Sequence, residues 1–428
     1  AILHMTLHYR WLTMLVMAAL LMSALFSFTK VKQAFFPDSS LPVIMVDYWL
    51  PEGSSIHATE EDITALEHDV LAMKQVRQVT STIGAGATRF MLTYAPEKAF
   101  PSYAQLLVQT HSYQDVSLVL ENTRKIVREK YPQAFARFRL QSVGPSTAAK
   151  IEARIMGPDT AVLRKIGSQI IELFNSDPDA MNVRQDWRER TKVVEPLMDA
   201  AAARRLGISQ SDLDAAIKRT LIGENVGTLR NGSDSLPIIL RPPQHEREGI
   251  EQITQVQVYS TMTGEYVDAG QFLLGTHLTW EDPIIKRQDR KRTLSVLADP
   301  SENSNPFALL AKLKGPTEAL SLPPGYSLEW GGEYEAQQKA NKAVFKFVPL
   351  GLLVMIIITV FMFNSLKQTL VIWITVPLAI VGVAYGLLLF GAPFSFTALL
   401  AVLSLIGMQI KNGIVLVEEI KRLNEEEN

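Results

Sequence analysis

The chain has 428 residues, of which 47% are hydrophobic, and a formal net charge of -2. A charge this close to zero argues against a general nucleic-acid-binding protein, which usually has a strong basic excess. The sequence contains no cysteine, which excludes disulfides, thiolate zinc sites and cysteine nucleophiles.

Four apolar stretches are long enough to cross a bilayer, and we expect transmembrane helices at 11–30, 347–363, 369–390 and 394–417. A helix of about 20 residues spans the hydrocarbon thickness, since each residue rises about 1.5 Å. The first stretch could be a signal peptide, but its apolar core is too long and no small-x-small cleavage site follows it. The last three could be core helices of a soluble protein, but their short connectors favour a hairpin of membrane helices.

Basic residues near the ends of these stretches predict their orientation. If the spans alternate in direction, one side of the membrane receives Arg10, Lys367, Lys421 and Arg422. The other side receives Lys30, Lys32 and Lys346, but a large polar region is translocated largely regardless of its charge. We therefore expect both ends of the chain in the cytoplasm and residues 31–346 outside the membrane.

The polar region begins with alternating strand and helix patterns. The predicted strands are 41–51, 75–84, 89–97 and 137–143, and the predicted helices are 57–73 and 112–131. A Gly-Ala-Gly turn joins the second and third strands. The order β-α-β-β-α-β is that of a ferredoxin-like split unit, so we expect a first subdomain over 40–147.

The same pattern starts again at residue 150 and is then interrupted. A strand, a helix at 160–176 and a strand at 181–187 are followed only later by β-α-β patterns at 292–300, 305–315 and 326–334. The segment between them holds a helix pair broken at Gly207 and strands at 236–241 and 255–260. We therefore expect a second ferredoxin-like subdomain that is split by an insert, in a protein of membrane helices and an α+β region.

No constellation of residues predicts catalysis or a resident metal site. The seven histidines are scattered without metal-ligand spacing, and the Gly-Ala-Gly-Ala segment joins two strands and opens no helix, so it is no phosphate loop. Met45, Met91 and Met156 lie on or near strands and could line a path for metal ions, but methionines more often fill gaps in cores. We predict that the protein is not an enzyme.

Lys411 and Asn412 interrupt the last apolar stretch, where a charge costs about 2.5–3.5 kcal/mol. Polar residues recur at every seventh position and share one helix face: Thr397, Ser404, Lys411 and Glu418. A polar face indicates a side that turns toward other helices. Alternatively, Lys411 could snorkel, because the end of the stretch lies only about 9 Å away at ~1.5 Å per residue. Snorkelling does not explain Asn412.

Several motifs, in the same order, resemble the resistance-nodulation-division (RND) exporters of the hydrophobe/amphiphile efflux, AcrB/AcrD/AcrF-type branch. These motifs are "ARRLGIS" (203–209), "LPPGYSLEWGGEY" (322–334), "NSLKQTLVIWITVPLAIVG" (364–382) and "IKNGIVLVEE" (410–419). Members of that family have twelve spans in two similar halves, with an acidic pair in the N-terminal half and a lysine in the C-terminal half. The resemblance therefore implies a C-terminal half, from the seventh to the tenth span.

The resemblance also implies roles for residues and segments. Lys411 and Asn412 would form a proton relay with the acidic pair, driven by the proton motive force without a cofactor. The first porter subdomain would be 40–147, and the second would combine 148–198 with 286–334. The insert at 199–285 would be a docking subdomain.

The substrate path of the family crosses the first porter subdomain. Residues that share faces of the predicted strands there are Met45, Asp47, Phe90, Leu92, Tyr94, Phe138 and Leu140. Packing on the subdomain's own helices explains any single one of them equally well. The loop at 83–88 has no aromatic residue, which departs from multidrug members and puts a broad aromatic specificity in doubt.

The implied function is proton-driven export of hydrophobic or amphiphilic compounds from the bacterial inner membrane or periplasm toward an outer-membrane channel, with multidrug resistance as the outcome. The implied partners are the N-terminal half of the pump, a periplasmic adaptor, the outer-membrane channel and the lipid membrane, in a homotrimer without nucleic acid. Two alternatives stay open: a membrane-anchored assembly or secretion accessory without transport, and a metal-efflux RND member.

Overall fold

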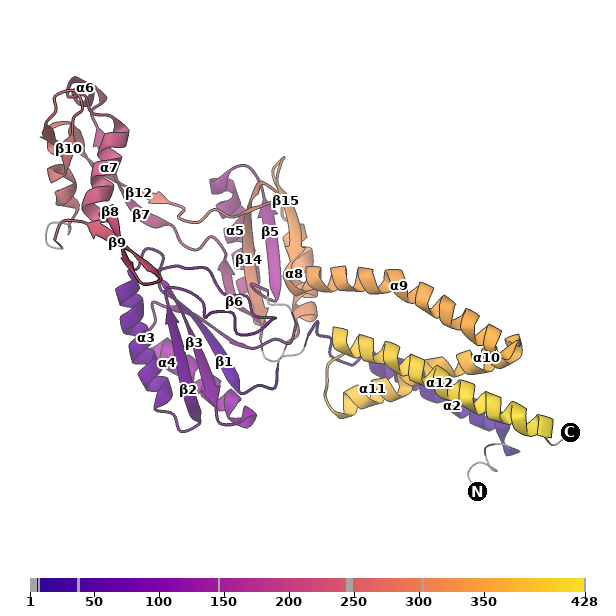
Figure 1. Ribbon diagram of the computed structural model, residues 1–428. Coiled ribbons are helices and arrows are strands. Elements are labelled where there is room, and N and C mark those ends of the chain that lie inside the picture. Colours follow the sequence, from indigo (N-terminus) through magenta and orange to yellow (C-terminus); the bar gives the residue numbers. More distant parts are fainter. Residues whose placement is uncertain are drawn as a thin grey trace. The chain divides into compact units, whose positions relative to one another are not determined.

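A computed structural model of the protein describes residues 6, 8–36, 39–144, 147–243, 249–301 and 304–426. The chain forms two compact units: Ala1–Arg188 with Ile284–Asn428, and Glu189–Pro283. The first unit holds two α/β layers and a group of long helices (Figure 1).

The first α/β layer is a four-stranded antiparallel sheet with two helices on one face. Its elements are β1 (Val43–Trp49), α3 (Ile56–Leu71), β2 (Val76–Ile83), β3 (Tyr103–Thr110), α4 (Val116–Lys130) and β4 (Phe135–Leu140). The strands lie in the order β2-β3-β1-β4. Ile44, Val46 and Tyr48 of β1 are buried in the core with residues of both helices, so Met45 and Asp47 lie on the opposite face because side chains alternate along a strand.

The strand predicted at 89–97 is wrong, and the partner of β2 is β3. Residues 89–97 form a loop, in which Tyr94 N donates to Met91 O at 3.2 Å and Arg89 Nε to Tyr94 O at 3.0 Å. Pro96 lies within the predicted range and cannot donate to a strand ladder. The apolar run at 103–110 supplies the ladder instead.

The second α/β layer combines two distant segments of the chain. The first supplies β5 (Ile151–Met156), α5 (Thr160–Asn175) and β6 (Ala180–Gln185), and the second supplies β13 (Arg287–Gln288), β14 (Lys291–Pro300), α8 (Pro306–Glu318) and β15 (Ser327–Gly331). The strands run β13-β14-β5-β15, with β6 also paired to β14. Phe174 and Trp187 are fully buried between this sheet and its helices.

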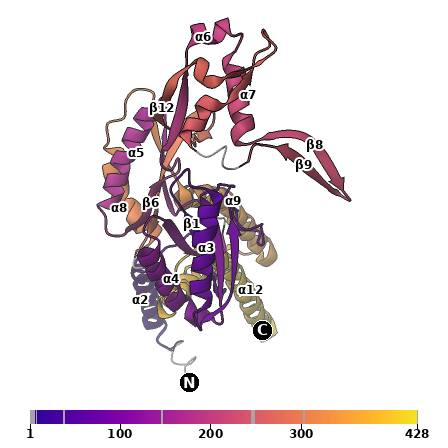
Figure 2. The same ribbon diagram turned by 90° about the vertical axis from the view of Figure 1, so that its left-hand side faces the viewer.

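The second unit is built on a long antiparallel pair, β7 (Thr191–Met198) with β12 (Leu273–Glu281). It also contains α6 (Ala200–Arg205), α7 (Gln210–Leu221), η3 (Ile250–Gln255), η4 (Ala269–Gln271) and the pairs β8 (Glu224–Asn231) with β9 (Asp234–Leu240) and β10 (Gln257–Tyr259) with β11 (Tyr266–Asp268). Gly207 separates the two helices with a φ of 69°, as expected from the sequence. Figure 2 shows β8 and β9 as an extended ribbon. The unit starts before the insert boundary predicted at 199, because β7 pairs within it.

Among the described residues, four helical stretches are long and apolar enough to cross a membrane: Arg10–Phe28, Gly332–Phe363, Leu366–Leu389 and Phe396–Leu423. They correspond to α2 (Arg10–Phe28), α9 (Gly332–Phe363), α10 (Leu366–Thr375) with α11 (Ala379–Leu389), and α12 (Phe396–Glu426). The third is broken around Pro377, where the ring removes a backbone donor. The helix α9 follows β15 directly and so starts well before the span predicted at 347.

Candidate functional site

A buried carboxylate occupies the face of β1 that the helices leave free. Asp47 is 2% exposed, and it accepts hydrogen bonds from Tyr103 Oη at 2.8 Å, Gln105 Nε2 at 2.7 Å and Arg139 Nε at 2.7 Å. These donors stand on β3 and β4, the two neighbours of β1. Burial opposes ionisation of Asp47, but Arg139, Arg137 and Gln105 outweigh it and hold the pKa of the carboxyl below its usual value.

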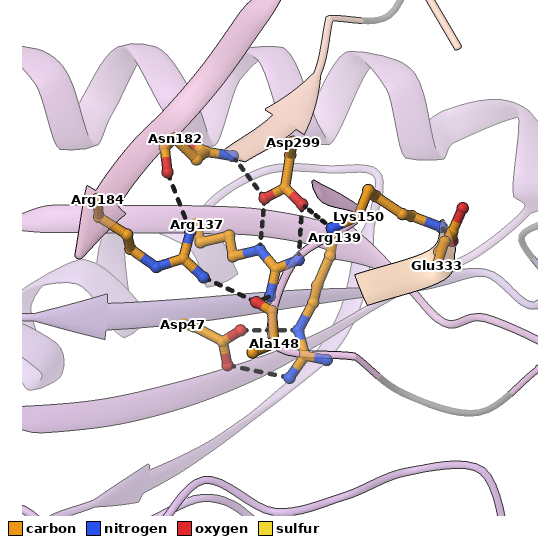
Figure 3. Close-up of polar contacts among 9 residues, drawn as sticks. All are labelled: Asp47, Arg137, Arg139, Ala148, Lys150, Asn182, Arg184, Asp299 and Glu333. Atoms are coloured by element: carbon orange, nitrogen blue, oxygen red, sulfur yellow. Dashed lines mark hydrogen bonds and ion pairs between the residues drawn. The ribbon is translucent and has the colours of Figure 1, made fainter. Parts of the chain in front are cut away.

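A second buried ion pair joins the first layer to the second (Figure 3). Arg137 of β4 donates from Nε and Nη2 to the two oxygens of Asp299 on β14, at 2.8 and 2.9 Å. Asn182 and the backbone of Lys150 donate to the same carboxylate. Burial opposes ionisation of Asp299, but Arg137 and Arg184 lower its pKa. This two-pronged contact constrains the relative orientation of the Arg137 and Asp299 groups as well as their distance.

Arg184 completes the group from β6. Arg184 Nη2 and Arg137 Nη1 both donate to Ala148 O, each at 2.8 Å (Figure 3). Burial, together with the neighbouring Arg137 charge, lowers the pKa of Arg184 to about 10.

The long helix α9 is tied to the second layer at its first turn. The Lys150 ammonium contacts Glu333, and Arg154 Nη1 donates to Glu335 at 2.6 Å. Glu333 and Glu335 are also favourably placed near the positive end of the helix dipole. The first turn of α9 is therefore fixed to β5 and to the segment before it.

A cavity of about 1060 Å³ lies between the two α/β layers and the ends of the long helices. Its basic lining residues are Lys32, Arg124, Arg137, Arg139 and Lys150, and its acidic ones are Glu121, Asp299 and Glu333. Its apolar and aromatic wall includes Phe36, Met45, Tyr94, Phe138, Leu140 and Met181. Among the described residues, no three His, Cys, Asp or Glu side chains come together in a way that would hold a metal ion.

The structure brings only some of the predicted path residues to this cavity. Met45, Tyr94, Phe138 and Leu140 line it, and Asp47 lies buried behind Arg139. Phe90 and Leu92 are 48% and 86% exposed and do not line it. The predicted alternation of Phe90, Leu92 and Tyr94 along a strand is wrong because the segment is a loop, in which Phe90 stacks on Tyr94 with ring centroids 4.7 Å apart.

The polar face of α12 is not covered by the other helices that the structure describes. Ile410, which is buried, and the partly buried Ile406, Ile414 and Val417 pack α12 onto α9 and α10. The four polar positions are Thr397, Ser404, Lys411 and Glu418, and all of them are exposed. Asn412 is exposed as well, and within the described part of the chain Lys411 forms no ion pair.

Sequence reasoning missed the ion pairs between the layers. The strand "FARFRL" (135–140) does carry a signal, since Arg137 and Arg139 alternate with aromatic and apolar residues and so share one face. Nothing in the sequence near Asp299 or Glu333 indicates that these acids meet Arg137 and Lys150, because each pair joins segments that are more than 150 residues apart.

Comparison with known proteins shows the family of the chain. It matches the family model described as "AcrB/AcrD/AcrF family" over residues 1–428. It is 25% identical over 343 residues to the cobalt-zinc-cadmium resistance protein CzcA of Cupriavidus metallidurans, covering 77% of this chain and 31% of CzcA. It is 24% identical over 409 residues to the nickel and cobalt resistance protein CnrA of the same organism, covering 92% of this chain and 38% of CnrA.

The fold agrees with these relatives. The crystal structure of a heavy metal efflux pump superposes with a TM-score of 0.78 at 20% identity, covering 96% of this chain and 42% of that one. The chain thus spans less than half the length of the proteins that it matches. The relatives are named for metal resistance, which gives no support to the multidrug resistance expected from the sequence. Since the family model matches the whole length, the chain belongs to the AcrB/AcrD/AcrF family of RND efflux transporters.

Proposed function

We propose that this chain is the C-terminal half of a proton-driven RND exporter in a bacterial inner membrane, with its α/β units in the periplasm. The uncovered polar face of α12 carries this proposal. A charge among apolar helices is costly unless it meets a partner or a water-filled space. The α12 side chains that pack on α9 and α10 are those of Ile410 and its neighbours, and Lys411 beside them is exposed. The partner therefore comes from helices outside this chain, and an acidic pair in the N-terminal half meets this need.

Lys411 with Asn412 would then relay the proton-driven step. An ammonium responds to neighbouring charge and burial by changing its protonation more readily than a guanidinium does. Proton entry at the acidic partner would release Lys411, and proton loss would attract it again. The remaining alternative, an accessory protein without transport, leaves the polar face of α12 without a role.

For the cargo, we propose a heavy-metal cation. The named relatives confer resistance to cobalt, zinc, cadmium and nickel, and this supports the metal-efflux alternative over the hydrophobic compounds expected first. In the cavity, the thioethers of Met45 and Met181 are neutral donors that favour soft cations. Gln141 also lines the cavity and contacts the Met91 sulfur behind it.

A second cargo class has a specific observation in its favour. The cavity has five basic and three acidic lining residues, beside Phe36, Tyr94 and Phe138. An excess of basic groups next to aromatic rings suits an amphiphile with an anionic group better than a free cation.

We further propose that both α/β layers are ferredoxin-like porter subdomains. In each layer the strands of the β-α-β-β-α-β order pair as second-third-first-fourth, which supports this. The unit Glu189–Pro283 would be the docking subdomain, and a trimer of the complete pump would work with a periplasmic adaptor and an outer-membrane channel.

The test uses the complete transporter that carries this chain, expressed in an efflux-deficient bacterium. We expect resistance to one or more of cobalt, zinc, cadmium, nickel, copper and silver to rise, and to fall to the background level in Lys411→Met at equal expression. Lys342→Met, which alters an exposed lysine of α9, is the matched control and should behave like wild type.

The outcomes separate the proposals. Protection only against anionic amphiphiles would replace the metal cargo by the second class. Normal export by Lys411→Met would make this lysine a membrane anchor and would contradict the relay.

A further inference from the structure

The linker after α2 and the start of α12 are joined by backbone hydrogen bonds. Phe394 N donates to Lys32 O at 2.8 Å, Ala34 N to Phe394 O at 3.2 Å, and Phe396 N to Phe35 O at 3.0 Å. Gln33 and Phe394 form a parallel bridge. We call residues 32–36 with 393–396 the clasp.

Aromatic rings pack the clasp from both sides. The ring centroids of Phe28 and Phe394 are 4.9 Å apart, and those of Phe35 and Phe36 are 4.7 Å apart. The ring centroid of Phe396 lies 6.0 Å from that of Phe35 and 5.7 Å from that of Phe36. Phe35 is buried. Backbone bonds and packed rings together leave this junction little freedom to slide or rotate.

One side of the clasp forms part of the cavity wall. Lys32, Gln33, Ala34, Phe36 and Pro393 line the cavity. Phe36 also presses on the backbone after β4, where a Cβ built on Gly144 would overlap the Phe36 ring. A displacement of Phe36 must therefore alter the cavity wall or move the segment that follows β4. The strand β4 carries Arg137 and Arg139.

The other side of the clasp continues into the first turn of α12. Phe396 opens this helix, and Lys411 stands 15 residues further along, which is about 22 Å at ~1.5 Å per residue. Gln409 Nε2 donates to Thr375 O at 2.7 Å, so α12 is also held near the break in the third apolar stretch. The helix α12 is continuous over this length, which is the condition for a shift at Lys411 to reach Phe396.

We propose that the clasp is the rigid connection through which movement of α12 reaches the cavity wall that the clasp itself forms, with Phe36 and Phe396 as its positioning residues. This inference rests on the proposed export function. It predicts that the clasp stays closed throughout the transport cycle and that loosening it separates proton movement from cargo movement.

The first experiment loosens the clasp in the complete transporter. Phe36→Ala and Phe396→Ala keep the backbone bonds and empty the ring cluster, and Phe390→Ala is the matched control because its ring is 83% exposed. In proteoliposomes we expect at least a tenfold loss of cargo-stimulated proton flux for the first two, with the control unchanged. Phe396→Leu, which keeps an apolar group of similar size, should recover most of the flux, and the unfolding temperature is measured for each variant.

The second experiment locks the clasp. This chain has no cysteine, and residues across a β-bridge lie within the Cα separation of a disulfide. Gln33→Cys with Phe394→Cys is therefore introduced into a complete transporter in which any cysteine outside this chain is replaced by serine. We expect equal export from the oxidised and reduced forms, and partial recovery of export when the disulfide is formed in Phe396→Ala.

Two results would overturn the inference. Loss of export on oxidation would mean that the clasp must open, and normal coupling in both alanine variants would mean that the rings only pack. The wild type and Lys411→Met are measured in parallel. If the wild type itself shows no Lys411-dependent export, the proposed function fails and the clasp inference fails with it. A defect in Lys411→Met and in the clasp alanine variants, with Phe390→Ala normal, supports both.

Discussion

The α/β layers and the apolar helices differ in how they accommodate charge. Asp47 and Arg137 are buried, and each has a partner of opposite charge within the chain. Lys411 stands on an apolar helix, exposed, and has no ion-pair partner among the described residues. In the first region these buried charges are paired within the chain, whereas in the second the described residues offer Lys411 no ion-pair partner.

This difference has an energetic meaning. Moving an ion out of water costs several kcal/mol, which only a well-placed partner offsets. In the layers that partner arrives when the chain folds. Under the proposed function, the partner of Lys411 arrives by assembly with other helices, and the charge of Lys411 then bears on function more than on the folding of this chain.

The largest effect on stability is expected for Arg137→Ala. It leaves Asp299 buried without its two-pronged partner, and removal of one member of a buried pair costs about 3–5 kcal/mol. Thermal and urea unfolding of the purified protein measure the loss. Arg77→Ala, at an exposed arginine on β2, is the control and should change the free energy of unfolding by less than about 0.5 kcal/mol. A similar loss of unfolding free energy in both variants would show that the buried ion pair is no more important for stability than an exposed charge.

At the boundary between the two regions, Gly332→Ala should cost about 2 kcal/mol, because it combines left-handed strain with a backbone clash. Gly332 has a φ of 68°, and its Cβ would lie 2.7 Å from Lys150 O. Gly351→Ala in α9 meets nothing within 4 Å and should instead stabilise the protein by up to about 1 kcal/mol. Unfolding of both variants under one condition tests the pair.

Acid should weaken the layers through their paired carboxylates. The pKa of Asp47 is lowered in the folded state, so below about pH 4 the unfolded chain binds more protons at this group than the folded chain. The stabilisation by Asp47 is therefore present above this range and is lost as the pH falls. Asp47→Asn should be less stable at pH 7 and should show a shallower decline in acid, measured by circular dichroism. An unchanged acid slope would contradict this role.

The smallest effect is expected for the stability of Lys411→Met. The side chain has no partner in the described chain that the change could remove, and methionine keeps the volume of the stem, so the free energy of unfolding should change by less than about 0.5 kcal/mol. The measurement is thermal unfolding of the purified protein in detergent. A loss as large as that of Arg137→Ala would show that Lys411 is already paired within the chain.

The sequence by itself determined the features that depend on local periodicity. The four apolar stretches, the broken helix pair at Gly207 and most strands follow from the apolar spacing and from turn residues along the chain. The polar face of α12 could also be predicted, because positions seven apart in a helix share one face. The strand prediction at 89–97 is wrong because an alternating pattern also occurs in loops, and Pro96 lacks the backbone donor that a strand ladder needs.

Only the tertiary structure decided which charges join the two α/β layers. The sequence Val-Arg-Gln occurs at 76–78 in β2 and at 183–185 in β6, and both strands lie beside the third strand of their own β-α-β-β-α-β order. Arg77 is exposed. Arg184 lies over the Phe135 ring at 5.5 Å and donates to Ala148 O. The two Val-Arg-Gln segments differ in role because only the second one contacts the other layer, through Arg184. Contacts between distant segments of this kind leave no local trace in the sequence.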